Sequence, residues 1–262
     1  MKWLKGLLIN IQFFTAIPVN AALPMDQEHL EKAVKTFPVL GLIQGGLYIF
    51  LYYAVLQWTP FSALTAAFVL WLAGILITGG IHLDGWMDAS DAFFSYRDRE
   101  KRLEIMNDPR VGAFGVLSVL VLLSARFFFI YEITQQVEPW SYFLAGLIPF
   151  FSKTVMGVLL LKVPGAKKEG LGALFQNAAN DRTLLMYPVY ILIVLSAGIA
   201  FHQAWMGVIL FAVVSALMLP VFKRKIIGWF GGMTGDLLGA STEGTELVLW
   251  MILWLFHYFA MV

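Results

Sequence analysis

Three aspartates in one short segment are the residues of this chain best suited to chemistry. Asp84, Asp88 and Asp91 are spaced at i, i+4 and i+7. At ~100° per helical residue their side chains fall within an arc of about 60° on one helix face, and we call them the aspartate stripe. Like charges at this spacing destabilise a helix, so a bound cation is the economical explanation. Carboxylate oxygens, with no thiol or imidazole in the stripe, indicate Mg²⁺ or Mn²⁺ rather than zinc.

The stripe has a structural alternative, which is a hydrated loop whose aspartates keep the surface wet. Asp84 alone would be a good helix N-cap. Capping does not account for Asp88 and Asp91 on the same face of an otherwise apolar segment. The sequence therefore favours a divalent-metal site, and such a site commonly handles phosphate or diphosphate groups.

A basic segment follows the stripe and offers charge of the opposite sign. Arg110 lies between Pro109 and Gly112 at an expected helix start, where its guanidinium and free backbone N–H groups can share a phosphate. Arginines at 97–102 have an equally good interpretation as markers of the cytoplasmic surface. The phosphate-binding candidates in this segment are Arg97, Asn107, Asp108 and Arg110.

Two further polar segments are rich in glycine. Five glycines lie between positions 228 and 239, beside Asp236 and Glu243, which are seven residues apart. This pattern indicates backbone that approaches a ligand, or glycines that pack helices closely. The turn at Lys167-Lys168 also contains glycine, and a solvated loop is its favoured interpretation.

Two cations lie inside apolar runs. Arg126 and Lys153 have no acidic partner that the sequence places at their depth, since Glu132 and Glu246 are expected nearer the two membrane surfaces. Buried charges of this kind usually face a cavity. We therefore expect both to bind phosphate, with a purely structural role as the alternative.

The elements that position these residues are membrane-spanning helices. The chain is 60% hydrophobic and 13% charged, against ~45–50% and ~25% for soluble proteins. It has no cysteine, which excludes disulfide scaffolds, zinc-thiolate sites, iron–sulfur clusters and thiol nucleophiles. We predict one all-α membrane bundle over residues 1–262, with about seven spans of ~20 residues at 37–58, 61–82, 112–134, 140–161, 184–201, 204–221 and 246–262.

Charge predicts the orientation of this bundle. With a tight turn at His202-Gln203, all of the 18 lysines and arginines except Arg126 and Lys153 fall on one side, which is cytoplasmic under the positive-inside rule. The long loops at 83–111, 162–183 and 222–245 then face the cytoplasm, and the C-terminus lies outside. We do not expect the protein to bind nucleic acid. The predicted partner is the lipid bilayer of the cell (inner) membrane.

The N-terminal segment is predicted to lie in the membrane interface. Residues 3–18 place their apolar side chains on one helical stripe, with Asn10 off it. The segment lacks a convincing cleavage site, so we expect it to be retained rather than removed as a signal peptide. The stripe consists of Leu4, Leu7, Leu8, Ile11 and Phe14.

Taken together, these motifs resemble the cobalamin synthase family, adenosylcobinamide-GDP ribazoletransferase. The most specific is His82-Leu83-Asp84-Gly85-Trp86-Met87-Asp88-Ala89-Ser90-Asp91. The other motifs occur in the family's order and cover nearly the whole chain, at 12–19, 37–41, 97–100, 104–112, 170–172 and 231–240.

The resemblance implies a reaction and assigns roles. The adenosylcobinamide phosphate would pass from its GDP linkage to the ribose 3′-hydroxyl of α-ribazole or of its 5′-phosphate, with release of GMP. Mg²⁺ is the expected cofactor, bound by the aspartate stripe. Asp84, Asp236 and Glu243 are the catalytic candidates, the last two as metal support or general base, while Arg110, Arg126 and Lys153 would bind phosphates. The oligomeric state stays open, with a homo-oligomer among the alternatives.

Two other functions compete with this interpretation. A CDP-alcohol-type membrane phosphotransferase would also use aspartates at the membrane surface, but Asp88-Ala89 stands where its motif has Ala-Arg. A membrane transporter should distribute its polar residues through the midplane or broken helices, whereas here they concentrate in the cytoplasmic loops.

Overall fold

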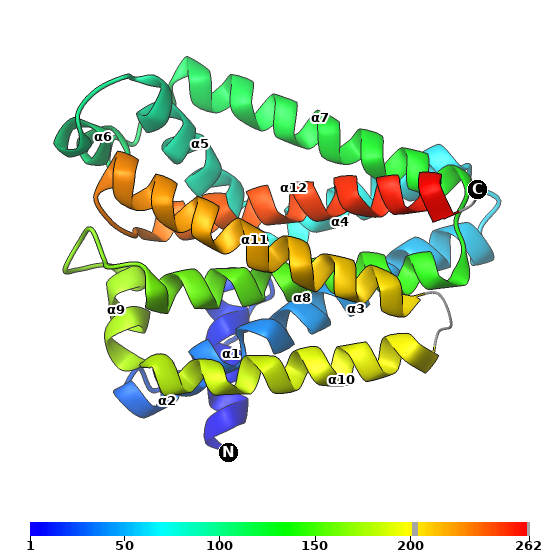
Figure 1. The fold of residues 1–262 in the computed structure, drawn as a ribbon, viewed down its shortest axis with the longest axis horizontal. Coiled ribbons are helices and arrows are strands. Elements are labelled where there is room, and N and C mark those ends of the chain that lie inside the picture. The colour runs from blue at the N-terminus through cyan, green and yellow to red at the C-terminus, as the bar shows by residue number, and fades with distance from the viewer. Residues whose placement is uncertain (201–203, 261–262) are drawn as a thin grey trace.

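The chain folds into a bundle of helices in the computed structural model, which describes residues 1–200 and 204–260 (Figure 1). That part of the chain contains no β-strand beyond one isolated bridge. The helices are α1 (Lys2–Phe14), α2 (Gln27–Lys35), α3 (Phe37–Trp58), α4 (Ala63–Thr78), α5 (Ile81–Phe94), α6 (Arg99–Ile105), α7 (Ala113–Gln135), α8 (Pro139–Lys162), α9 (Leu171–Ala178), the 3₁₀ helix η1 (Asp181–Leu185), α10 (Met186–Ala200), α11 (Ala204–Phe230) and α12 (Gly235–Ala260).

Long apolar helices confirm the all-α membrane class. Within residues 1–200 and 204–260, five helical stretches are long and apolar enough to cross a membrane, and they are α3, α7, α8, η1 with α10, and α11. The bent pair α4 and α5 makes up to six. The seventh predicted span corresponds to α12, which is 26 residues long but carries polar residues in its first half. The predicted turn at His202-Gln203 lies outside the described residues.

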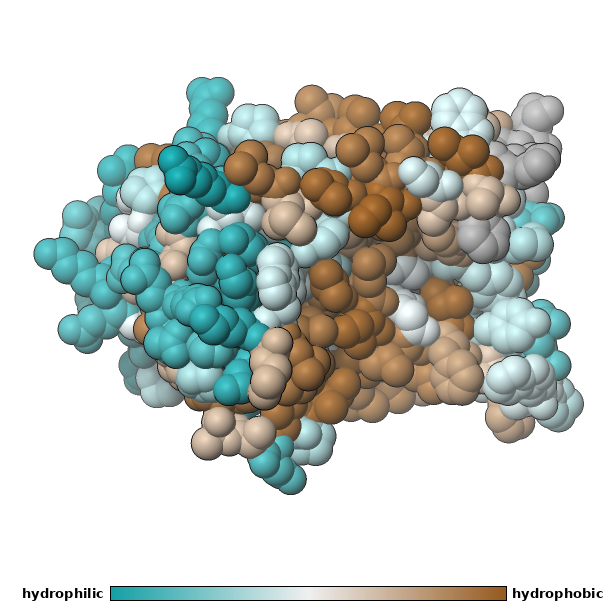
Figure 2. All heavy atoms as spheres, turned by 90° about the horizontal axis from the view of Figure 1, so that it is seen from below, coloured by the Kyte–Doolittle hydropathy of each residue, from teal (hydrophilic) through white to brown (hydrophobic). Residues whose placement is uncertain are grey.

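The surface of the molecule is divided into an apolar middle and two polar ends. On the face seen in Figure 2, a broad apolar band crosses the middle of the molecule and polar side chains gather at its two ends, most densely at one of them. The dense end is where α5, α6 and α9 lie in Figure 1. Such a band is what a bilayer with a hydrocarbon core of ~30 Å requires.

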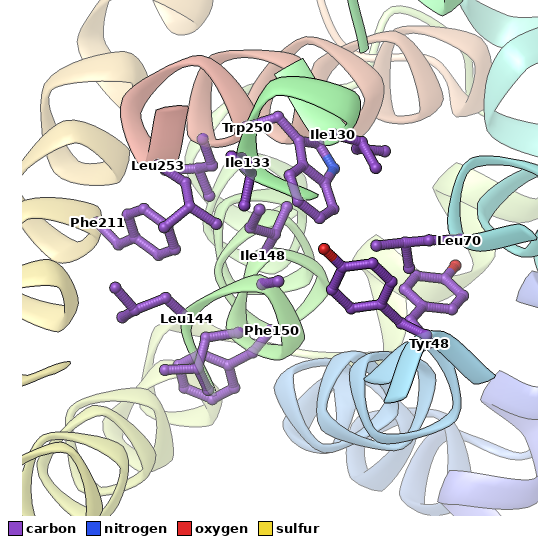
Figure 3. Packing of buried hydrophobic residues seen from close by; sticks show 14 of the residues in the cluster. Tyr48, Leu70, Ile130, Ile133, Leu144, Ile148, Phe150, Phe211, Trp250 and Leu253 are labelled. Atoms are coloured by element: carbon purple, nitrogen blue, oxygen red, sulfur yellow. The ribbon is translucent and has the colours of Figure 1, made fainter. Parts of the chain in front are cut away.

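Helix α8 forms the centre of the bundle. Large side chains from α3, α7, α8, α11 and α12 meet around it in the main apolar core (Figure 3). Its contact with α3 depends on Gly41 and Gly45, because a Cβ atom at either position would collide with the α8 backbone at Pro149 or Gly146. Small residues that allow backbones to approach are the usual basis of helix packing in membranes.

A sharp bend between α4 and α5 sets the direction of the aspartate-bearing helix. Gly79 and Gly80 both adopt positive φ values, of 64° and 75°, which glycine reaches without steric cost. The axes of α4 and α5 differ by 85°. The predicted span at 61–82 was therefore too long, since α4 stops at Thr78 after 16 residues and α5 leaves its direction.

The N-terminal helix turns a polar side chain toward the protein. Asn10, expected off the apolar stripe, is fully buried, and its Nδ2 donates to Ala33 O at 2.8 Å and to Thr36 Oγ1 at 3.0 Å. Leu4, on the apolar stripe predicted for the membrane interface, is 62% exposed. Helix α1 thus faces α2 with its Asn10 side and leaves apolar side chains outward, as an interfacial helix would.

Candidate active site

Helix α5 carries the aspartate stripe and packs against the start of α12. The approach is close because residue 85 is glycine, and a Cβ atom there would lie 2.5 Å from Asp236 O. Asp84 is exposed, while Asp88 and Asp236 are half-buried. The sequence predicted Asp236 as a catalytic residue, and the structure places it beside the stripe.

Asp91 is bound to the beginning of α7. Its two carboxylate oxygens accept hydrogen bonds from the backbone N–H groups of Gly112, at 2.7 Å, and Gly115, at 2.8 Å. The first N–H groups of a helix lack partners within that helix, and a carboxylate is favoured there by the helix dipole. A Cβ atom at either glycine would collide with this carboxylate. Asp91 therefore joins α5 to α7.

The remaining aspartates repel one another. Asp88 and Asp236 both lie outside the five helical stretches that are long and apolar enough to cross a membrane on their own. Burial, together with the charges of Asp84, Asp236 and Asp91, raises the pKa of Asp88 to about 6. Burial also raises the pKa of Asp236, and Lys167 opposes the increase at both groups. A positively charged ligand at this point would relieve the repulsion.

These carboxylates do not form a closed metal cage. Across residues 1–200 and 204–260, no group of three or more His, Asp or Glu side chains gathers closely enough to hold a metal ion. The ligand set predicted from the stripe stays a prediction. Mg²⁺ needs no such cage, because it commonly takes one or two carboxylates and completes its shell with water and substrate phosphates.

The turn at Lys167-Lys168, predicted from the sequence to be a solvated loop, belongs to the site. The backbone at 164–166 pairs with Met233, through Ala166 N to Met233 O at 2.9 Å and Met233 N to Pro164 O at 2.7 Å. Lys167 then donates to Asn107 Oδ1 at 2.6 Å. The sequence feature that could have indicated a role for Lys167 is its position near glycines, which are also frequent around Met233, the residue that this loop contacts.

The basic segment after α5 lies at the same end of the molecule. Arg110 forms a two-pronged ion pair with Asp108, through Nε at 2.9 Å and a terminal nitrogen at 2.6 Å. This pairing lowers the pKa of Asp108 to about 2. The Arg110 side chain is nonetheless 87% exposed. Arg97 is also exposed, so both remain accessible to a ligand in solution.

The buried cations have acidic partners, contrary to the sequence prediction. Arg126 is hydrogen-bonded to Glu243, and its other terminal nitrogen lies 3.8 Å from Glu246. Lys153 Nζ lies 4.0 Å from Glu246. We call these four residues the buried ion network. Glu246 was expected at the membrane edge, but α12 already begins at Gly235 and so places it deeper. None of the network's four residues lines the cavity beside the aspartates.

A cavity of about 300 Å³ opens beside the aspartates. Asp84, Lys167 and Asp236 contribute polar groups to its lining. Much of the rest is glycine backbone or apolar. The main apolar and glycine residues are Phe14, Phe37, Met156, Leu160, Phe175, Gly165, Gly170, Gly172, Gly235 and Gly239.

The fold and this site define a class: a polytopic helical membrane protein with an acidic, cavity-bearing site at its polar end. The family model for cobalamin-5-phosphate synthase matches residues 6–254, so the chain belongs to that family. This confirms the resemblance drawn from the motifs.

Individual relatives agree with the family match. The chain is 39% identical over 260 residues to the adenosylcobinamide-GDP ribazoletransferase of Geobacillus sp. (strain WCH70), covering 98% of each chain. The protein of the same name from Geobacillus thermodenitrificans (strain NG80-2) is also 39% identical, over 261 residues and 98% of each chain. That of Clostridioides difficile (strain 630) is 31% identical over 264 residues, which are 98% of this chain and all of the relative. No solved structure matches the chain significantly.

Proposed function

We propose that this protein is an adenosylcobinamide-GDP ribazoletransferase. The reaction joins the 3′-hydroxyl oxygen of α-ribazole to the phosphorus that carries adenosylcobinamide. It breaks the phosphoanhydride bond to GMP, which leaves with the electron pair of that bond. The hydroxyl proton passes to a base. The relatives named above carry this name, and their sequence matches to this chain cover nearly their full length.

The observation that carries the proposal is the meeting of α5 and α12 beside a cavity. Asp84 and Asp236 come from these two helices and both line the cavity, as does Lys167. Phosphoryl transfer needs few reacting protein groups and depends mainly on positioning and on neutralising charge. Carboxylates for a metal and a lysine for phosphate are the side chains that such a site requires.

Mg²⁺ is the cofactor that we propose for this site. The donor set fits, since Asp84 and Asp88 offer hard oxygen ligands, and burial together with the neighbouring carboxylates raises the pKa of Asp88. These residues would hold the ion together with substrate phosphates. The ion would neutralise negative charge on the diphosphate. Asp91 has both oxygens engaged by α7, and we assign it to holding α5 in place.

The protein side chains divide the remaining tasks. Asp236 is the base that we favour, because it lines the cavity and its pKa is raised by burial, which brings a carboxylate closer to the pH at which it works best. Glu243 does not line the cavity and is paired with Arg126, so we assign it to the buried ion network. Lys167, Arg110 and Arg97 would bind phosphate oxygens.

One reconstitution tests the proposed function. The purified full chain in detergent is given adenosylcobinamide-GDP, α-ribazole and Mg²⁺, and GMP and the cobalamin product are measured. GMP should appear only when both substrates are present. GMP release without α-ribazole, or no release at all, contradicts the proposal. A chelator arm tests the metal, since turnover should stop when Mg²⁺ is removed and return when it is restored.

We also propose that the polar end faces the cytoplasm and that the C-terminus lies outside. The proposal rests on the cations, which concentrate in the loops at that end. A reporter that is active only outside the cytoplasm is fused after residue 262 or at residue 170. Activity at 262 and none at 170 is expected, and the reverse result would invert the orientation.

A further inference from the structure

The cavity beside the aspartates has an aromatic inner wall that the reaction chemistry above leaves unused. Phe14 packs against Phe37 with ring centroids 5.4 Å apart, and both contact Phe175, at 5.7 and 5.9 Å. The ring of His82 stacks on Phe14 at 6.0 Å, with an interplanar angle of 19°. All four residues line the cavity.

Burial shows which side of the cavity is deep and which is its mouth. Phe37, His82 and Phe175 are at most 3% exposed. Asp84 and Gly235, which also line the cavity, are exposed. The cavity therefore runs from a polar rim, where the phosphates would lie, to an apolar aromatic end.

We propose that the aromatic end binds the flat base of the acceptor nucleoside, so that its ribose lies at the aspartate rim. This inference rests on the proposed function and names the acceptor's subsite within it. A cavity of about 300 Å³ is at the small end of ligand pockets. It suits a nucleoside with an apolar bicyclic base, whereas the corrinoid donor is several times larger and must stay outside.

The chemistry of the wall selects between the guanine of the donor and the base of the acceptor nucleoside. Guanine carries hydrogen-bonding groups around most of its edge, and the deep wall of Phe14, Phe37, Met156, Leu160 and Phe175 would leave most of them unpaired at a high cost. Dimethylbenzimidazole, the base of α-ribazole, has two methyl groups and, in the nucleoside, a single free ring nitrogen. An apolar wall favours this base.

The one free ring nitrogen has a candidate partner. Within the part of the chain that the structure describes, His82 Nε2 is buried without a hydrogen-bond partner. A buried polar atom without a partner is costly, and such atoms are normally satisfied by protein, water or ligand. In the tautomer protonated at Nε2, His82 would donate to the free nitrogen of the base. His82 is therefore a positioning and specificity residue.

The first test narrows the cavity. Ala173, on α9, lines the cavity, so Ala173→Leu reduces the space for the base. One misplaced methylene in an apolar pocket changes selectivity by about 10-fold or more. We expect kcat/KM to fall at least about 10-fold for α-ribazole and less than about 3-fold for the riboside of unmethylated benzimidazole. Asn177→Leu, on the exposed side of the same helix, is the matched control and should leave both values unchanged.

The second test removes the donor. His82→Phe keeps a flat ring and should raise the KM for α-ribazole by about 3- to 10-fold, the value of one hydrogen bond, with little change in kcat. The riboside of dimethylindole, which lacks the ring nitrogen, should bind parent and variant equally. His82→Gln retains an N–H donor and should recover part of the affinity.

The outcomes separate this inference from the proposed function. If the parent protein releases no GMP with α-ribazole, the proposed function fails. If the parent turns over but Ala173→Leu lowers kcat/KM equally for both benzimidazole nucleosides, or for neither, the subsite is elsewhere. Equal effects of His82→Phe on the indole and benzimidazole nucleosides would likewise overturn the role of His82.

Discussion

Glu243→Gln should destabilise this protein strongly, because it removes one charge from a balanced buried group. The buried ion network holds two cations, Arg126 and Lys153, and two carboxylates, Glu243 and Glu246, with side chains at most 8% exposed. The substitution keeps the shape of Glu243 but leaves two buried cations beside one carboxylate. Removing one partner of a buried pair costs about 3–5 kcal/mol.

The measurement is thermal unfolding of the purified protein in detergent. A loss of that size corresponds to roughly 6–20 °C at the ~2–4 °C per kcal/mol expected for a chain of this length. Arg126→Gln alone should cost a similar amount. The double variant, with Gln at both 126 and 243, restores charge balance between Lys153 and Glu246 and should recover most of the stability.

The double variant also separates stability from catalysis. If Glu243 is structural, as its pairing with Arg126 indicates, the double variant should regain GMP release along with stability. A stable but inactive double variant would restore the sequence prediction that Glu243 acts as a base. Glu243→Gln with a parental unfolding temperature would refute the electrostatic argument itself.

Three further predictions concern α5. Asp84→Asn and Asp88→Asn should each lower the rate of GMP release about 10²-fold or more, at unchanged or higher stability. Asp91→Asn weakens the hydrogen bonds to α7 and should lower the unfolding free energy by about 1–2 kcal/mol. Parental rates of GMP release for the first two variants would remove Asp84 and Asp88 from the mechanism.

The folded-state pKa of Asp88, about 6, exceeds the ordinary value of 3.8, so the folded protein binds more protons between about pH 4 and 6 and loses stability as pH rises through that range. In metal-free buffer Asp88→Asn should therefore stabilise the protein above pH 6 and not near pH 4, and a pH-independent difference in unfolding temperature would contradict this. Gly85→Ala should separate α5 from α12 and abolish turnover, while Gly46→Ala, with open space around it, should leave turnover unchanged.

The sequence predicted well what depends on composition and local spacing. The apolar runs gave the membrane class, and the i, i+4, i+7 spacing correctly placed Asp84, Asp88 and Asp91 on one helix. Local spacing did not show that Asp91 is used by another helix, since Gly112 and Gly115 come 21 and 24 residues later. The same carboxylate pattern serves a ligand site or a helix contact, and only the fold distinguishes them.

Contacts between distant segments were the main source of error. Arg126 and Glu243 are 117 residues apart, so no pattern along the chain pairs them. The helical wheel placed Asn10 off the apolar stripe but did not show that this side of the helix contacts α2. In a membrane, apolar side chains can face lipid, and a polar residue with protein partners is then the one that turns inward.

The composition of the aromatic cavity constrains when the protein can become active during synthesis. Its wall takes Phe14 from the first helix, His82 from α5, Phe175 from α9 and Gly239 from α12. A nascent chain that has inserted its first helices therefore has only one side of the cavity. The acceptor subsite is completed only when the last helix docks, so incomplete translation products would have no acceptor pocket and could not divert the corrinoid donor.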